Sequence, residues 1–307
     1  MDLNSISDWL QASLRLAAPL MLTSLGAVYT ERVGVVNIGM EGMMLAGALV
    51  AVAASFLTGN VAVAAICAMA VGGLLGVVHA YLTVSRRGSQ LISGAAINFL
   101  ALGATNFAYA RLFATERARV ATYPVLSPPG LRSVPFFGPV IFAQPVIVWI
   151  ALILPFVFAW VLYRTSWGLN IRAVGEHPQA VASAGLSVFR LKYVGVILSG
   201  VFAGLGGSAL SLAELGYFAP AMTGGRAFVV LAANVVGNWN PIVVAAACVL
   251  FGAADAMQLR FQTLGSVIPY QFPLMVPYLL TIAALAGLVG RTAVPKTLGK
   301  PYDPETI

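Results

Sequence analysis

The sequence predicts an all-α polytopic membrane protein with about 8–10 transmembrane helices, some of them broken or re-entrant. Two observations lead to this fold class. Of the 307 residues, 60% are hydrophobic and only 9% are charged, whereas a soluble globular chain carries about 25% charged residues. The hydrophobic residues also fall into runs close to the ~20 residues that a helix needs to cross a bilayer. We expect a single transmembrane domain over residues 1–307.

The apolar runs define the expected spans in chain order. They cover residues 14–29, 33–57, 61–84, 91–110, 143–163, 193–213, 242–258 and 274–290. Gly39 to Gly42 interrupt the second run, and Asn238 to Pro241 follow a run, 227–237, that is too short to cross alone. Irregular backbone at membrane depth is tolerated where it is buried in protein or lines a cavity. Both interruptions therefore predict broken helices beside a cavity.

The basic residues predict how the chain is oriented. Cytoplasmic loops of membrane proteins carry an excess of Lys and Arg, and the formal net charge is +7. We expect Arg86 with Arg87, the loop 164–192 and the C-terminal tail in the cytoplasm, and the loop 111–142 outside despite its arginines. About nine crossings would then place the N-terminus outside. No basic run interleaves with aromatic residues in a solvated segment, so the charge indicates a partner in membrane lipid and not nucleic acid.

The loop 164–192 contains the signal for a short helix. Pro178 suits a first helical position, where its missing N–H costs nothing, and Gly185 suits a left-handed stop. The residues between them are mostly small and would form about two turns, roughly 10 Å long. We interpret 178–184 as a cytoplasmic docking helix. An ordinary basic loop between two membrane helices explains the same spacing equally well.

Polar residues inside the apolar runs are the candidates for a translocation pathway. Ionisable groups there are costly and usually functional, and amides both donate and accept hydrogen bonds, which suits a sugar or nucleoside better than a simple ion. Any single Asn more often joins two helices than binds a ligand, but the group as a whole indicates a polar pathway. The candidates are Asn37, Glu41, Asn98, Asn106, Asn234, Asn238 and Asp255.

Gly200 and Gly204 have the small-xxx-small spacing that lets two helix backbones touch. Packing against a neighbouring helix of the same chain is the more common meaning of this spacing.

Enzyme chemistry and metal binding are not expected. His79 and His177 lie far apart, and Cys67 and Cys248 both lie inside apolar runs, so no catalytic constellation and no metal-ligand spacing appears. A Gly-rich ATP-binding loop ending in Gly-Lys-Ser/Thr is also missing. We therefore expect this chain to bind no cofactor itself.

Four motifs in order resemble one known family. ERVGVVNIGMEGMMLAGA (31–48) resembles the signature of permease subunits of ATP-binding-cassette (ABC) importers for nucleosides and simple sugars of the ribose type, and GLNIRAVGEHPQAVASAGL (168–186) resembles their coupling segment. LSGVFAGLGGS (198–208) and the stretch 237–256 continue a resemblance that covers nearly the whole chain, with one departure at Ala232–Asn234. The residues expected to couple to an ATPase are Arg172, Gly175, Glu176, Gln179, Ala180, Ala182, Ala184 and Gly185.

The resemblance implies a transport subunit of a prokaryotic plasma membrane. Such a permease pairs with a second, related permease, sits on a cytoplasmic ABC ATPase that binds ATP and Mg²⁺, and receives substrate from an extracellular or periplasmic binding protein. An alternative is a proton-coupled secondary transporter that uses Glu41 and Asp255, although it leaves the docking helix without a role. A membrane enzyme would need a cluster of catalytic groups at one membrane face, which the sequence does not offer.

Overall fold

The computed structural model describes residues 3–113, 120–127, 137–263 and 293–303, together with isolated positions between 275 and 286. These residues are mainly helical. One short antiparallel strand pair among them joins β1 (Val125–Leu126) to β2 (Gln144–Pro145). The helices are α1 (Leu3–Arg32), α2 (Met40–Thr58), α3 (Val61–Ala80), the π-turn η1 (Tyr81–Ser85), α4 (Gln90–Leu112), α5 (Phe137–Phe142), α6 (Val146–Arg164), α7 (Ser166–Glu176), α8 (Pro178–Ser183), α9 (Val188–Ala209), the π-turn η2 (Leu210–Leu215), α10 (Arg226–Val236) and α11 (Pro241–Thr263).

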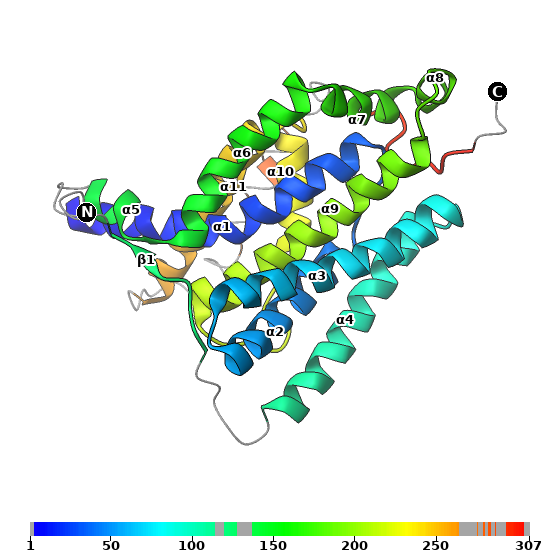
Figure 1. Cartoon of the computed structure of the whole chain (residues 1–307). Helices are drawn as coiled ribbons and strands as arrows, with labels where there is room; N and C mark the ends of the chain where they lie inside the picture. The colour runs from blue at the N-terminus through cyan, green and yellow to red at the C-terminus, as the bar shows by residue number, and fades with distance from the viewer. Residues whose placement is uncertain are drawn as a thin grey trace.

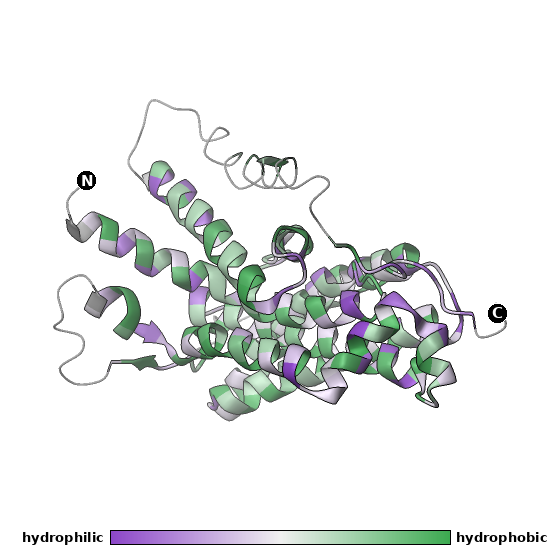
Figure 2. Cartoon of the chain, turned by 90° about the horizontal axis from the view of Figure 1, so that it is seen from above, coloured by the Kyte–Doolittle hydropathy of each residue, from purple (hydrophilic) through white to green (hydrophobic). Residues whose placement is uncertain are grey.

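Seven helices of the described part are long and apolar enough to cross a membrane: α1, α2, α3 with η1, α4, α6, α9 with η2, and α11. Their surfaces are mostly hydrophobic in Figure 2. The expected span 274–290 lies outside the described residues, and α10, with 11 residues, is too short to cross alone. The prediction of an all-α, multi-pass membrane protein is confirmed.

The first helix break lies earlier in the chain than the sequence suggested. Thr30–Arg32, the polar residues that follow the apolar run 14–29, form the last turn of α1, and Gly34 then ends the helix with a left-handed φ of 82°. Glu41 and Gly42, expected in the break, belong to the first turn of α2. Gly42 is there because of packing, since a Cβ at this position would lie 2.8 Å from the carbonyl oxygen of Ile97 in α4.

Helices α1, α2 and α9 form the buried centre of the bundle, and glycine allows α9 to sit close to its neighbours. A Cβ at Gly200 would overlap the carbonyl oxygen of Gly72, and one at Gly204 would overlap that of Ala68. Both contacts are with α3, so the small-xxx-small pair joins two helices of this chain. Close backbone approach is how helices associate in lipid, where no hydrophobic force drives them together.

The bundle has two distinct ends, which Figure 1 shows at opposite sides of the molecule. Helices α7 and α8 and the C-terminal tail lie at one end, called the α8 end below. The N-terminus and α5 lie at the other, called the opposite end. Helix α4 runs along the edge of the bundle between the two ends, and only 28% of its apolar window is buried. Its outer side is therefore free to face lipid or another protein.

Replacing Gly204 with Val is expected to destabilise the bundle, because the new side chain would overlap the backbone of α3. Forced overpacking costs about 1–3 kcal/mol or more. The measurement is the thermal midpoint of the purified protein in detergent. Gly103→Ala is the matched control, since nothing lies within 4 Å of a Cβ at Gly103. An equal midpoint for the two variants would contradict the packing argument.

Candidate functional site

Three cavities follow one another along α4. The cavity at the α8 end, about 250 Å³, is lined by Gln90 and Leu91. The middle cavity, about 400 Å³, is lined by α4 residues between Ala95 and Leu102, and the cavity at the opposite end, about 710 Å³, is lined by Tyr109 and by Phe113, which caps α4. A helix of 23 residues is about 35 Å long, so the row of cavities covers the thickness of a bilayer.

The same three segments line the middle cavity and the one at the opposite end. The middle cavity is lined by residues of α2 between 41 and 45 and by residues between 221 and 228. The cavity at the opposite end is lined by Val52 of α2 and by residues 216–220. The two cavities are therefore neighbours between α2, α4 and the segment 216–228, and together they are a candidate pathway.

Glu41 and Asn98, two of the predicted pathway residues, both line the middle cavity. The Glu41 carboxylate accepts hydrogen bonds from the backbone N–H groups of Gly225 at 2.7 Å and Ala227 at 2.9 Å, which lie at the N-terminus of α10. The amide oxygen of Asn98 accepts from Gly42 N–H at 2.7 Å, in the first turn of α2.

Both side chains therefore satisfy N–H groups that a helix N-terminus leaves without an intrahelical partner. The negative charge of Glu41 also suits the positive end of the α10 dipole. The two residues hold helix ends in place at the cavity wall, and their polar groups are engaged before any ligand arrives.

Asn37 and Asn234, predicted for the pathway, are fully buried and are absent from the linings of the three cavities. The Asn37 side chain donates to Ser199 Oγ at 2.7 Å, which joins the first break to α9. Asn234 donates to Glu31 Oε1 at 3.1 Å. In these positions both amides connect helices.

The remaining predicted pathway residues also lie outside the cavity linings. Asn106 is exposed on α4, and Asn238 is exposed in the turn before α11. Asp255 is partly buried and interacts electrostatically with Arg226. Arg226 Nη2 also forms an ion pair with Glu214 at 3.3 Å. Asp255 therefore belongs to a small cluster of compensating charges.

A cluster that the sequence did not reveal connects the two helix breaks, and we call it the joint: Glu31, Arg32, Asn234, Asn238 and Trp239. The Glu31 carboxylate accepts from Asn234 and from the indole N–H of Trp239. Arg32 donates to the carbonyl oxygens of Asn238 at 3.1 Å and Trp239 at 3.3 Å. Asn238 and Trp239 have left-handed φ values of 49° and 53°. Asn adopts this conformation readily, but it is unusual for a bulky residue such as Trp239, so the joint holds strained backbone in place there.

Two further contacts bring other elements to the joint. The buried Lys192 of α9 donates to the carbonyl oxygen of Val33 at 2.7 Å, just after α1 ends. Gly175 of α7 packs on the backbone of Arg32, since a Cβ there would overlap the Arg32 carbonyl oxygen. Sequence reasoning assigned Lys192 to a solvated loop. Its place beside a long apolar run was the signal that it is buried.

The short helix predicted in the loop 164–192 is present as α8. Pro178 occupies its first turn, and Gly185 follows it with a φ of 80°. Pro178 and Val181 are buried. The exposed side of α8 and its C-cap carries small or polar residues, namely Gln179, Ala180, Ala182, Ser183 and Ala184. Arg172, Gly175 and Glu176, predicted with them, lie on α7 instead.

The segment 293–303, called the strap below, crosses the α8 end and contacts four parts of the chain. Its Ala293 N–H donates to Asn238 Oδ1 at 2.9 Å. Thr297 donates to the Gly175 carbonyl oxygen from both its backbone N–H and its hydroxyl. The Gly299 N–H donates to the Gly34 carbonyl oxygen. The Asp303 carboxylate forms an ion pair with Arg87 at 3.1 Å. The strap also forms part of the wall of the α8-end cavity.

Residues 10–288 match the family described as "Branched-chain amino acid transport system / permease component", and the chain belongs to this family of membrane permeases. It is 40% identical to the guanosine ABC transporter permease protein NupQ of Bacillus subtilis, with 95% of each chain covered. It is 35% identical to the putative glucose ABC transporter permease protein TsgC13 of Haloferax volcanii, covering 96% of this chain and 97% of that one. No solved structure matches.

A third relative is the nucleoside ABC transporter permease protein NupC of Lactococcus lactis, which is 32% identical over 93% of each chain. The same three organisms each contribute a second, more distant permease to the matches, named NupP, TsgB13 and NupB. In these three organisms the relatives therefore occur as pairs of related permeases.

Replacing Glu41 with Gln is expected to loosen α10, because a neutral amide can accept only one of the two N–H bonds and carries no charge for the helix dipole. Such interactions are worth about 1–3 kcal/mol, so the thermal midpoint in detergent should fall. Asp8→Asn, at an exposed position of α1, is the control and should leave the midpoint unchanged. A Glu41→Gln variant as stable as the wild type would show that the cap is unimportant.

Proposed function

We propose that this permease is one of two membrane subunits of an ATP-driven importer that carries a nucleoside into the cell. The row of three cavities along α4 supports this most directly, because they follow one another from one end of the bundle to the other. Two of the three relatives named above are nucleoside or guanosine permeases, which favours a nucleoside over a simple sugar. A second, related permease completes the pathway as a heterodimer.

The α8 end is the cytoplasmic end in this proposal. Basic residues gather there, including Arg86, Arg87, Arg172 and Lys296, and cytoplasmic segments are enriched in Lys and Arg. The opposite end then faces outward, where a binding protein delivers the nucleoside to the largest of the three cavities. The N-terminus lies on that outer side.

An ABC ATPase docks on α8 and supplies the energy, binding ATP and Mg²⁺ outside this chain. The exposed side of α8 consists of small residues, so a complementary surface can approach its backbone closely. Pro178 and Val181 anchor the helix on its buried side. A short helix that is anchored on its buried side and has few long side chains on its exposed side can move as a rigid body when the ATPase displaces it.

The contacts of the joint connect α8 to the candidate pathway, so that a displacement of α8 can reach the middle cavity. Helix α7 precedes α8 and rests on the backbone of Arg32 through Gly175. The neighbouring Glu31 holds the C-terminal part of α10, and Glu41 holds the N-terminal end of the same helix at the middle cavity. Helix α10 is about 16 Å long and acts as a rigid lever between the docking site and the cavity wall.

The contacts of the two candidate carboxylates argue against proton-coupled transport. Such a mechanism needs carboxylates that bind and release protons during the cycle. Glu41 is engaged by two backbone N–H groups, and Asp255 lies near the charge of Arg226. Glu41 therefore already has a structural role at the N-terminus of α10.

Replacing Ala182 and Ala184 with Glu is expected to abolish docking, because the two positions are exposed on α8 and its C-cap and bulky charges would be buried at the interface. An unpaired buried charge costs several kcal/mol, which corresponds to a loss of affinity of at least about tenfold for each change. The measurement is co-purification of the ATPase with the tagged permease, together with ATP-dependent nucleoside uptake in proteoliposomes.

The matched control is Ala62→Glu, an exposed alanine at the opposite end of the bundle. It should leave docking and uptake intact. The proposal would be refuted if the α8 variants still retained the ATPase, or if the permease alone carried nucleosides without ATP.

A further inference from the structure

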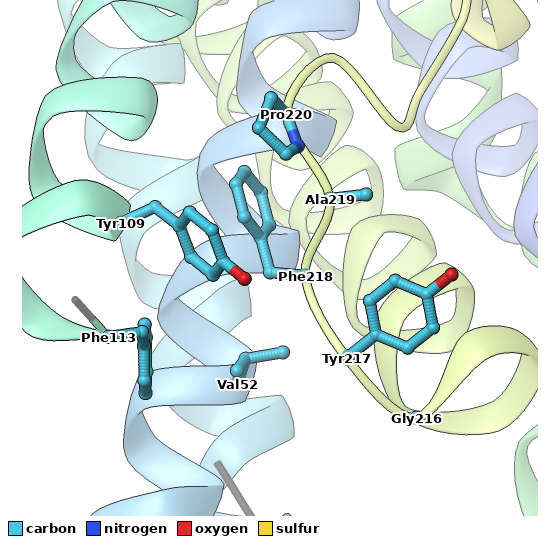
Figure 3. Close-up of a pocket in the computed structure, with 8 residues that line it drawn as sticks. All are labelled: Val52, Tyr109, Phe113, Gly216, Tyr217, Phe218, Ala219 and Pro220. Carbon is cyan, nitrogen blue, oxygen red and sulfur yellow. The ribbon is translucent and has the colours of Figure 1, made fainter. Parts of the chain in front are cut away.

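The cavity at the opposite end is rich in aromatic side chains, and a polar pathway alone would not require them. Its walls are Val52 from α2, Tyr109 and Phe113 from the end of α4, and the segment 216–220. Figure 3 shows the rings of Tyr109, Phe113 and Phe218 around one side of the space, with Tyr217 across from them. We call it the aromatic cavity.

The rings hold one another in place. The Tyr109 ring centroid lies 5.5 Å from that of Phe113 and 5.2 Å from that of Phe218. The Phe113 ring meets Phe56 of α2 edge to face at 5.7 Å, and Phe218 is almost completely buried. Mutual contacts at these distances fix ring positions, so the faces that border the cavity are already arranged before a ligand enters.

The lining indicates what kind of ligand fits. Among the described residues that line the cavity there is no charged side chain and no side-chain amide, and their polar side-chain groups are the two phenol hydroxyls of Tyr109 and Tyr217. A sugar carries a hydroxyl on nearly every carbon and is usually held by several polar side chains, whereas the described lining offers two side-chain hydroxyls besides the backbone of residues 216–220. A nucleobase has apolar faces and polar groups only at its edge, and it stacks well on aromatic side chains.

We propose that the aromatic cavity binds the base of the nucleoside by stacking on Tyr109 and Phe113, whose rings are held in place by the buried Phe218 and by Phe56. This proposal rests on the proposed function, and it specifies that the base is the part of the nucleoside that the permease recognises. The cavity volume of about 710 Å³ falls in the range of pockets that enclose small organic ligands. The segment 216–220 continues directly into residues 221–228 of the middle cavity, so a base bound here lies at the start of the pathway.

The test is guanosine uptake by the complete importer in proteoliposomes, with both permeases, the ATPase and the binding protein present. Loss of a stacking ring weakens base binding by about fivefold to more than a hundredfold. Tyr109→Ala should therefore raise the KM for guanosine at least about fivefold, while Tyr109→Phe, which keeps the ring, should restore the wild-type KM. Phe113→Leu, which keeps the bulk of the side chain without an aromatic face, should also raise the KM.

A second measurement does not depend on delivery by the binding protein. The assembled importer is irradiated with 8-azidoguanosine, and the labelled peptides are identified by mass spectrometry. Labelling of peptides that contain residues 109–113 or 216–220, suppressed by excess guanosine but not by excess glucose, would support the proposal.

The outcomes separate this proposal from the proposed function. Wild-type guanosine uptake with an unchanged KM in Tyr109→Ala and Phe113→Leu, or labelling confined to other peptides, would overturn the stacking site and leave nucleoside import standing. A larger rise in KM for glucose than for guanosine would also overturn it, because the cavity would then recognise a sugar. A wild-type importer that takes up no nucleoside would refute the proposed function itself, and the stacking site with it.

Discussion

The buried carboxylate of Glu31 is the interaction on which the arrangement of the helices depends. It accepts hydrogen bonds from Asn234 and Trp239, so it connects the end of α1 to the turn between α10 and α11. A carboxylate removed from water is costly unless its oxygens are satisfied, and these two donors come from α10 and from the turn that follows it. The irregular segments after α1 and after α10 therefore stabilise each other, and a change in the conformation of one would disturb the other.

This connection explains how irregular backbone persists between the spanning helices. The turn at Asn238 and Trp239 is strained, and strained backbone survives only where its surroundings hold it in place. Arg32 satisfies the carbonyl oxygens of that turn, and Lys192 satisfies the carbonyl oxygen of Val33 in the first break. Two basic side chains thus replace the hydrogen bonds that a continuous helix would have made.

Local patterns in the sequence predicted the membrane spans, the short helix α8 and two residues of the middle cavity, Glu41 and Asn98. Each of these depends on hydrophobic runs, turn residues or a single polar side chain in an apolar segment. The partners of those side chains could not be predicted, because Glu41 binds backbone that is 184 residues away and Glu31 binds Asn234 across 203 residues. Such pairings arise from tertiary packing and leave no trace in local periodicity.

The strap has a consequence for biosynthesis. Its backbone and the Thr297 hydroxyl bind Gly34 and Gly175, which the ribosome adds to the chain long before residues 293–303. Until the strap emerges, the carbonyl groups of these glycines lack the donors that it provides and can bind only water. The face that carries α7 and α8 is therefore completed last, after the earlier helices have been inserted. The proposed docking of an ATPase on α8 would therefore meet a finished surface only on chains whose synthesis has reached the strap.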